Sequence, residues 1–118
     1  MGIDAAKSVF PVCEATRLIK GEKVQLVAET LTAAGAVSVS TPGTLLDTGG
    51  AIAITLANGL EGQRKLIIMI DDGGTATCTP ANFANGTTIT FDDVYDMWEG
   101  IFHAGNWYTI GTATATVG

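Results

Sequence analysis

The sequence predicts an all-β protein: a single antiparallel β-sandwich or a compact, jelly-roll-like β-barrel, with an extended N-terminal arm. Short segments alternate apolar and polar side chains with a period of two, as strands with one buried face do. Turn-forming dipeptides separate these segments by roughly 8–12 residues, which is the spacing typical of sandwiches and small barrels. Glycine (15 residues) and threonine are abundant, as expected for tight turns and short strands.

The 118 residues suffice for one domain, which we divide into an arm, residues 1–20, and a β domain, residues 21–118. The arm contains Pro11 and shows no clean period. It is too apolar to be a solvated tail, so we expect it to lie on its own domain or on a neighbouring molecule. Its candidate assembly contacts are Ile3, Val9, Phe10 and Val12.

The β domain divides into short strands along the chain. Residues 36–40 and 51–57 each alternate an apolar set with a small or polar set, which predicts half-buried strands. Residues 66–70 are a continuous apolar run, and the nearby glycines and β-branched residues favour a strand covered on both faces. Further strands are expected at residues 24–29, 75–80 and 87–91, with a closing hairpin at residues 98–110.

The charge distribution argues against two classes of partner. The net charge is −6, and residues 31–118 hold only two bases against eight acids. Because no basic stripe is available to bind a phosphate backbone, we expect no nucleic-acid partner. No apolar run approaches the ~18 residues that cross a bilayer, so we expect no membrane partner either.

The two cysteines, Cys13 and Cys78, are expected to be free thiols. The N-terminal stretch lacks the charged region and apolar core of a secretory signal, so we expect synthesis in a reducing cytoplasm. Cys78 lies within a strand-like segment and is expected to point into the core.

The residues that could carry chemistry favour structural roles. His103 is the only histidine and lies at the tip of the predicted hairpin, where we expect neither a triad nor a metal centre. The densest acidic cluster lacks the ligand spacing of an EF-hand loop, so we expect a solvated loop or one that meets bases on a neighbour. We therefore predict no catalytic, cofactor or metal site and no enzymatic activity. The acidic cluster comprises Asp92, Asp93, Asp96 and Glu99.

The large side chains near the end of the chain are candidate contacts with a subunit or partner. Aromatic residues of this kind pack a hairpin or a subunit seam, and Trp98, Trp107 and Tyr108 can alternatively stack on a sugar ring. The candidates are Tyr95, Met97, Trp98, Trp107 and Tyr108.

Three motifs give the chain a family resemblance. They are Glu61-Gly62-Gln63 followed by Lys65, the turn Thr79-Pro80-Ala81-Asn82, and the segment Gly86-Thr87-Thr88-Ile89-Thr90-Phe91. With the segment order over residues 35–118, they resemble a module of virion structural proteins in tailed phages, particularly phages of cyanobacteria and other aquatic bacteria. The N-terminal arm lies outside the resemblance.

The resemblance implies a non-catalytic, homotrimeric module of a capsid decoration (cement) protein or of a head or tail fibre. For this chain we expect a decoration protein, made in the host cytoplasm, that binds the major capsid protein on the outside of the virion. The alternative is a fibre module that recognises a host glycan. The chain departs from the usual pattern by placing Tyr95, Met97 and Trp98 before its last hairpin.

Overall fold

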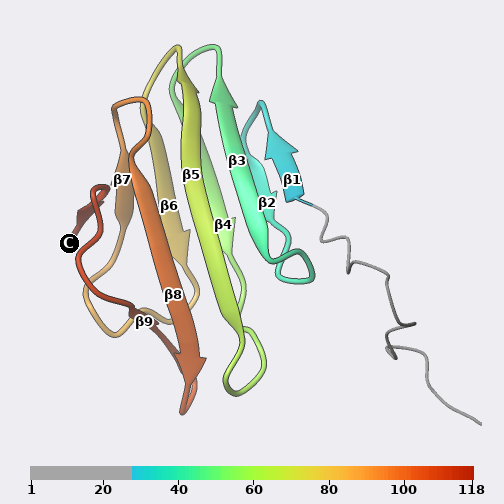
Figure 1. Cartoon of the computed structure of the whole chain (residues 1–118), viewed down its shortest axis with the longest axis vertical. Helices are drawn as coiled ribbons and strands as arrows, with labels where there is room; N and C mark the ends of the chain where they lie inside the picture. The colour runs from blue at the N-terminus through green and yellow to red at the C-terminus, as the bar shows by residue number, and fades with distance from the viewer. Residues whose placement is uncertain (1–27) are drawn as a thin grey trace, which may run out of the picture.

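The computed structural model describes residues 28–118, which form ten strands in two five-stranded sheets packed face to face (Figure 1). The predicted arm, including Ile3, Val9, Phe10 and Val12, and also Cys13, lies outside the described residues. Within residues 28–118 no helix is long and apolar enough to cross a membrane. The strands are β1 (Ala28–Leu31), β2 (Gly35–Val37), β3 (Gly43–Thr48), β4 (Ile52–Leu56), β5 (Arg64–Asp72), β6 (Ala76–Pro80), β7 (Ile89–Phe91), β8 (Met97–His103), β9 (Asn106–Thr109) and β10 (Thr116–Val117).

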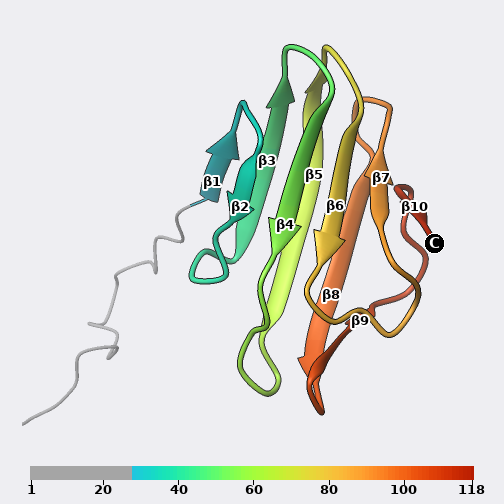
Figure 2. The ribbon, with the colours of Figure 1, turned by 180° about the vertical axis from the view of Figure 1, so that it is seen from behind.

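The front sheet has the strand order β1-β3-β5-β8-β9, and the back sheet has the order β10-β7-β6-β4-β2 (Figures 1 and 2). From β1 to β6 the chain crosses to the other sheet after every strand. Successive strands of one sheet therefore run in the same direction, and β1, β3 and β5 pair in parallel, as do β2, β4 and β6. Antiparallel pairing joins β5 to β8, β8 to β9, β6 to β7 and β7 to β10.

The predicted all-β sandwich is confirmed, with two differences. The sheets are mixed rather than antiparallel, because the first six strands wind between the layers instead of turning back as hairpins. They also remain two separate layers, so the alternative of a closed barrel is wrong. The hairpin at the end of the chain is confirmed as β8 and β9, with His103 opposite Asn106 and a positive φ at both intervening residues.

The core lies between the inner faces of the two sheets. Alternate residues of β4 and β5 point into it, among them Ile54, Ile67 and Met69, each no more than 1% exposed. The apolar run at residues 66–70 therefore divides between two environments. Its inner side chains are buried, whereas Leu66, Ile68 and Ile70 point outward from the front sheet. The expected cover on that second face is absent within residues 28–118.

Buried and partly buried polar groups between the front sheet and the segment that joins β2 to β3 are hydrogen-bonded. Lys65 is 1% exposed, and its Nζ donates to the carbonyl oxygen and to the Oγ1 of Thr41, each at 2.9 Å. The carboxylate of Glu29 accepts hydrogen bonds from the Thr44 hydroxyl at 2.8 Å and from the Ser38 backbone N–H at 2.9 Å. These bonds attach the segment between β2 and β3 to the front sheet.

Candidate interaction surfaces

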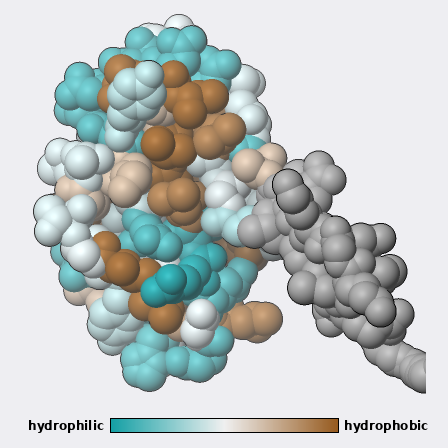
Figure 3. All heavy atoms as spheres, viewed as in Figure 1, coloured by the Kyte–Doolittle hydropathy of each residue, from teal (hydrophilic) through white to brown (hydrophobic). Residues whose placement is uncertain are grey.

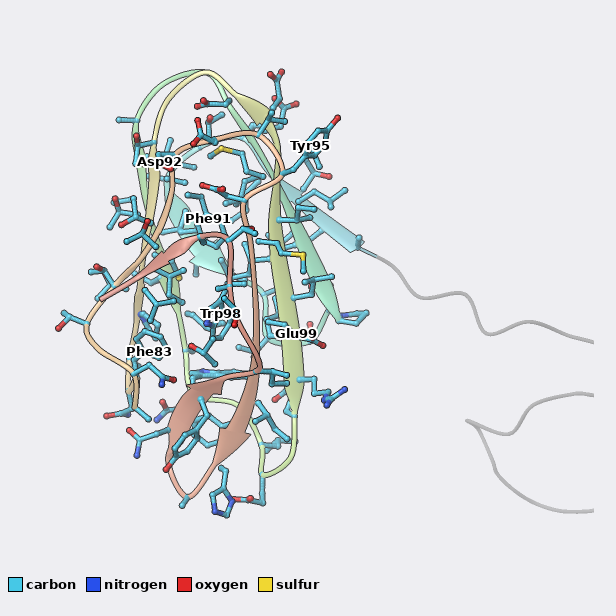
Figure 4. All side chains as sticks on the ribbon, turned by 60° about the vertical axis from the view of Figure 1, so that its left-hand side comes forward. Phe83, Phe91, Asp92, Tyr95, Trp98 and Glu99 are labelled. Atoms are coloured by element: carbon cyan, nitrogen blue, oxygen red, sulfur yellow. The ribbon has the colours of Figure 1, made fainter. Side chains whose placement is uncertain are left out.

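Trp98 and Trp107, two of the predicted contact residues, lie in the core and are fully buried. Their rings meet edge to face, with centroids 6.1 Å apart, and Phe83 packs against Trp98 in the same way (Figure 4). The Nε1 of Trp98 donates to Thr109 Oγ1, and that of Trp107 donates to the Ala57 carbonyl oxygen, each at 2.9 Å. Because the sandwich encloses both indoles, neither is available to a partner or to a sugar.

Tyr95, Met97 and Tyr108, the other predicted contact residues, lie on the surface. Tyr95 is 72% exposed, Met97 41% and Tyr108 37%. Tyr95 lies at one end of the sandwich, in the turn before β8, and its backbone N–H donates to the Met69 carbonyl oxygen at 2.7 Å (Figure 4). Its φ of 72° is unfavourable for a bulky residue, so the turn keeps the Tyr95 backbone in this conformation at an energetic cost.

The outer face of the front sheet carries a continuous set of aliphatic side chains, which we call the apolar stripe. Leu45, Ile68 and Met97 are direct neighbours across β3, β5 and β8. Figure 3 shows hydrophobic side chains gathered along the middle of this face. Ile70, like Met97, is 41% exposed. The stripe comprises Leu45, Leu66, Ile68, Ile70, Met97 and Ile101.

The outer face of the back sheet consists of small, uncharged side chains. Its strand registers place Thr55 beside Thr79, and Thr77 beside Thr90. Two shallow hollows in the described structure, one on this face and one beside the last strand, are lined without any titratable side chain. The outward residues of this sheet are Ala36, Ala53, Thr55, Thr77, Thr79, Thr90 and Thr116.

Carboxylates gather at one end of the sandwich, in and beside the loops after β3, β5 and β7. Asp92, Asp93 and Asp96 offer ligand atoms within 4.8 Å of one another, whereas Glu99 lies on β8 and is not part of this group. Asp96 Oδ2 accepts hydrogen bonds from the backbone N–H groups of Asp92 and Asp93, each at 3.1 Å. The hydrogen bond between the Asp92 and Asp96 side chains raises the pKa of Asp92, and desolvation and the neighbouring charges add to the rise. With one ligand atom from each carboxylate, this group offers three of the six to eight oxygens that Ca²⁺ takes.

At the opposite end of the sandwich, the only histidine contacts a carboxylate. His103 Nδ1 meets Glu61 Oε2, and Glu61 Oε1 accepts a hydrogen bond from the Ala104 backbone N–H at 3.0 Å. Both side chains are exposed, at 64% and 67%, and their hydrogen bonding lowers the pKa of Glu61. The pair ties the β8–β9 hairpin to the loop before β5.

Cys78 has the properties of a core residue and not of a nucleophile. It is a fully buried free thiol on β6. Burial disfavours the charged thiolate and raises the pKa of Cys78 to about 12. The predicted inward orientation of Cys78 is confirmed.

Of the apolar stripe, only Met97 was among the predicted contact residues. The sequence signal of this surface was the apolar run at residues 66–70, whose second face no helix covers within residues 28–118. A scan against protein-family models found no matching family, and a search of curated proteins found no matching sequence.

Proposed function

We propose that this chain is a non-catalytic structural protein of a phage particle: a capsid decoration protein that trimerises and binds the outside of the shell to stabilise it. The observation that carries the proposal is the scarcity of charge on both broad faces of a strongly acidic sandwich. The front face is mainly aliphatic, with Asp47, Arg64 and Glu99 as outward-facing charged residues, and the back face is built from alanine and threonine. The charged residues lie mostly at the two ends.

This arrangement is the one that a component of an assembly needs. A protein that works alone in water usually places charged side chains across its broad faces, because they keep copies apart. Here the net charge of −6 is compatible with solubility, while the broad faces offer little charge that would have to be desolvated in a contact. The faces are also rigid, since each consists of hydrogen-bonded strands backed by one packed core.

The resemblance of residues 35–118 to phage virion modules is the reason that we place the protein on a phage particle. On this basis the partners are further copies of the chain, in a homotrimer, and the major capsid protein. The site of action is the exterior of the virion after synthesis in the host cytoplasm. Decoration requires only stable contacts, which agrees with the buried, high-pKa thiol of Cys78 and with a surface histidine that ties a hairpin to a loop through Glu61.

Binding to shells tests this proposal. Purified full-length protein is mixed with expanded phage shells that lack their decoration protein, and co-sedimentation measures what is bound. We expect saturable binding in multiples of three copies and a higher temperature of shell rupture. The decoration role would be refuted if the protein did not bind the shells and did not change their rupture temperature.

The alternative of a glycan-recognising fibre module loses support from the burial of Trp98 and Trp107. Tyr108, at 37% exposure, is the remaining candidate platform of the original three aromatic residues. A glycan array probed with wild type and with Tyr108→Ala distinguishes the roles. Binding that the substitution abolishes would favour the fibre reading.

A further inference from the structure

We infer that Asn85 is a site of spontaneous modification, where the side-chain amide is lost as ammonia and an aspartyl or isoaspartyl residue is left in its place. This chemistry is independent of the proposed function, because it concerns one loop and requires no partner. An asparagine followed by glycine is especially prone to the reaction, since glycine has no side chain to shield its backbone nitrogen. The chain contains two such pairs, Asn58-Gly59 and Asn85-Gly86, and the fold places them in different environments.

The modification proceeds through a cyclic intermediate. The backbone nitrogen of Gly86 loses its proton to hydroxide and attacks Cγ of Asn85. A bond forms between that nitrogen and Cγ, the bond from Cγ to Nδ2 breaks, and Nδ2 takes up a proton from water and leaves as ammonia. Water then opens the resulting succinimide ring at either of its carbonyl carbons, which gives the aspartyl or the isoaspartyl linkage. Water and hydroxide are therefore the only reactants needed besides the chain itself.

The carbonyl group of the Asn85 side chain is held by a donor that favours the attack. Its Oδ1 accepts a hydrogen bond from the Thr109 backbone N–H at 2.7 Å. A fixed backbone donor at this distance polarises the carbonyl and stabilises the negative charge that develops on Oδ1 in the tetrahedral intermediate, as the donors of an oxyanion hole do. The leaving Nδ2 donates no hydrogen bond to any of residues 28–118, so its departure breaks none of them.

The attacking nitrogen of Gly86 is accessible. Asn85 and Gly86 are both exposed, and within the described part of the chain the Gly86 N–H donates no hydrogen bond. A Cβ atom added to Gly86 would be 2.7 Å from the carbonyl carbon of Gly118, so the fold requires glycine here. Asn85 and Thr109 also line the shallow hollow beside the last strand, which admits water to the reacting groups. The position thus combines an unshielded nitrogen with an activated carbonyl.

Asn58-Gly59 is the protected counterpart of this pair. Gly59 is half-buried, and a Cβ atom added to it would be 2.5 Å from Gln63 Oε1 and 3.0 Å from the Trp107 ring. Gln63 Oε1 also accepts a hydrogen bond from the Leu60 backbone N–H at 2.8 Å, which fixes the chain directly after Gly59. Ring closure has to move the Gly59 nitrogen toward the Asn58 side chain, and close packing against a core tryptophan opposes that movement.

The two products differ in their effect on the loop that covers β9. An aspartyl product keeps an oxygen at the place of Oδ1 and still accepts the Thr109 N–H, so it adds a negative charge with little structural change. An isoaspartyl product lengthens the backbone directly after Ala84, whose N–H donates to the Trp107 carbonyl oxygen at 2.9 Å. It therefore weakens the backbone hydrogen bonds that join residues 82–85 to β9.

The test is prolonged incubation of the full-length protein at mildly alkaline pH, where hydroxide removes the Gly86 amide proton more often. Ion-exchange chromatography separates the acidic product, and peptide mapping by mass spectrometry locates it. Methylation by an isoaspartyl methyltransferase distinguishes the two linkages. Asn85→Gln and Asn58→Gln are the matched variants, because glutamine keeps the amide but has to close a larger ring, which is much slower. Wild type incubated in urea at the same pH reports the reactivity of both sites without the fold.

In the folded wild type we expect Asn85 to be converted at least about tenfold faster than Asn58, which corresponds to a difference of about 1.4 kcal/mol in activation free energy. In urea the two sites should be converted at similar rates. The acidic product should form in Asn58→Gln as it does in the wild type, and it should be absent from Asn85→Gln.

Two outcomes would overturn the inference. One is a folded wild type in which Asn85 is converted no faster than Asn58. The other is a folded wild type in which Asn85 stays intact while both sites are converted in urea. Peptide mapping of the wild type decides between these results and the expected one even if Asn85→Gln does not fold, and none of them affects the shell-binding test of the proposed function.

Discussion

The indole ring of Trp98 lies directly over Gly100, two residues along β8. A Cβ atom added to Gly100 would be 2.2 Å from the ring, far inside van der Waals contact. The ring cannot withdraw, because it is fully buried, packs against Phe83 and Trp107, and donates a hydrogen bond to Thr109. Glycine at this position therefore lets the largest core side chain lie flat along its own strand.

Gly100→Ala is expected to lower the free energy of unfolding by about 1–3 kcal/mol, since overpacking displaces a ring that has no free space around it. Urea denaturation at one fixed protein concentration measures the change. Gly43→Ala is the matched control on β3, because its added Cβ meets its nearest neighbour, the Leu66 carbonyl oxygen, at an ordinary 3.8 Å. Equal stability losses in the two variants would contradict the assigned role of Gly100.

Much of the fold could be predicted because its signals are local. The alternation at residues 51–57 corresponds to β4, and the segment at residues 75–80 corresponds to β6. The closing hairpin is β8 and β9, where the turn residues Ala104 and Gly105 both have a positive φ. In each case one short stretch of sequence determines which side chains share a face and where the chain turns.

The parallel pairing could not be predicted because it depends on non-local choices. Strand β3 (Gly43–Thr48) was not among the expected elements, since turn-forming residues at both of its ends obscured a short leucine-containing segment. Pairing β3 with β5 in parallel requires the chain to cross through β4 in the other sheet. No turn dipeptide indicates that crossing. The expectation of antiparallel sheets therefore followed from turn signals alone.

The positions of the candidate contact residues, in the core or on the surface, could not be predicted from the sequence either. An alternating pattern separates two faces but does not say which face is inside, and Trp98 and Trp107 proved to be core residues while Tyr95 and Tyr108 lie outside. The contact between Glu61 and His103 joins residues 42 positions apart and left no trace in the sequence.

Cys78 is expected to resist thiol reagents in the folded protein. It is fully buried, and burial raises the pKa of its thiol to about 12, so the reactive thiolate is scarce at neutral pH. In a Cys13→Ser background, which leaves one thiol, labelling should occur only as fast as the protein unfolds. Addition of denaturant provides the control, because the same thiol should then react rapidly. Rapid stoichiometric labelling of the native protein would contradict the burial of Cys78.

Lys65 is expected to make stability rise with pH in the alkaline range. Desolvation lowers the pKa of this buried lysine below its usual value, and the negative charge of Glu29 opposes the shift only in part. The folded state therefore releases the proton of Lys65 before the unfolded state does, and the unfolded state binds more protons between the two pKa values. Under that condition the free energy of unfolding increases as pH rises from the folded pKa toward the ordinary lysine value of about 10.4.

Comparison with Lys65→Met isolates this contribution, because methionine keeps a long side chain but does not titrate. The free energy of unfolding is measured for both proteins by urea denaturation across the alkaline range. The free energy of unfolding of the wild type, relative to that of Lys65→Met, should increase as pH rises. Parallel curves would mean that Lys65 titrates alike in the folded and unfolded chains.

Glu61 is expected to titrate below the ordinary glutamate range because of His103. The hydrogen bond with the His103 side chain is the largest cause of the lowered pKa of Glu61, and the hydrogen bond from the Ala104 backbone N–H is the second. A carboxylate with a lowered pKa stabilises the folded state above its unfolded pKa, about 4.3, and loses that contribution as pH falls through the folded pKa. Carboxyl NMR titration measures the shift directly. His103→Ala should raise the pKa of Glu61 toward its usual value, with a residual lowering from Ala104. Leu60→Ala, a neighbouring change at a side chain that is 78% exposed, should leave it unaltered. A Glu61 pKa that is the same in wild type and His103→Ala would show that the pair does not persist in solution.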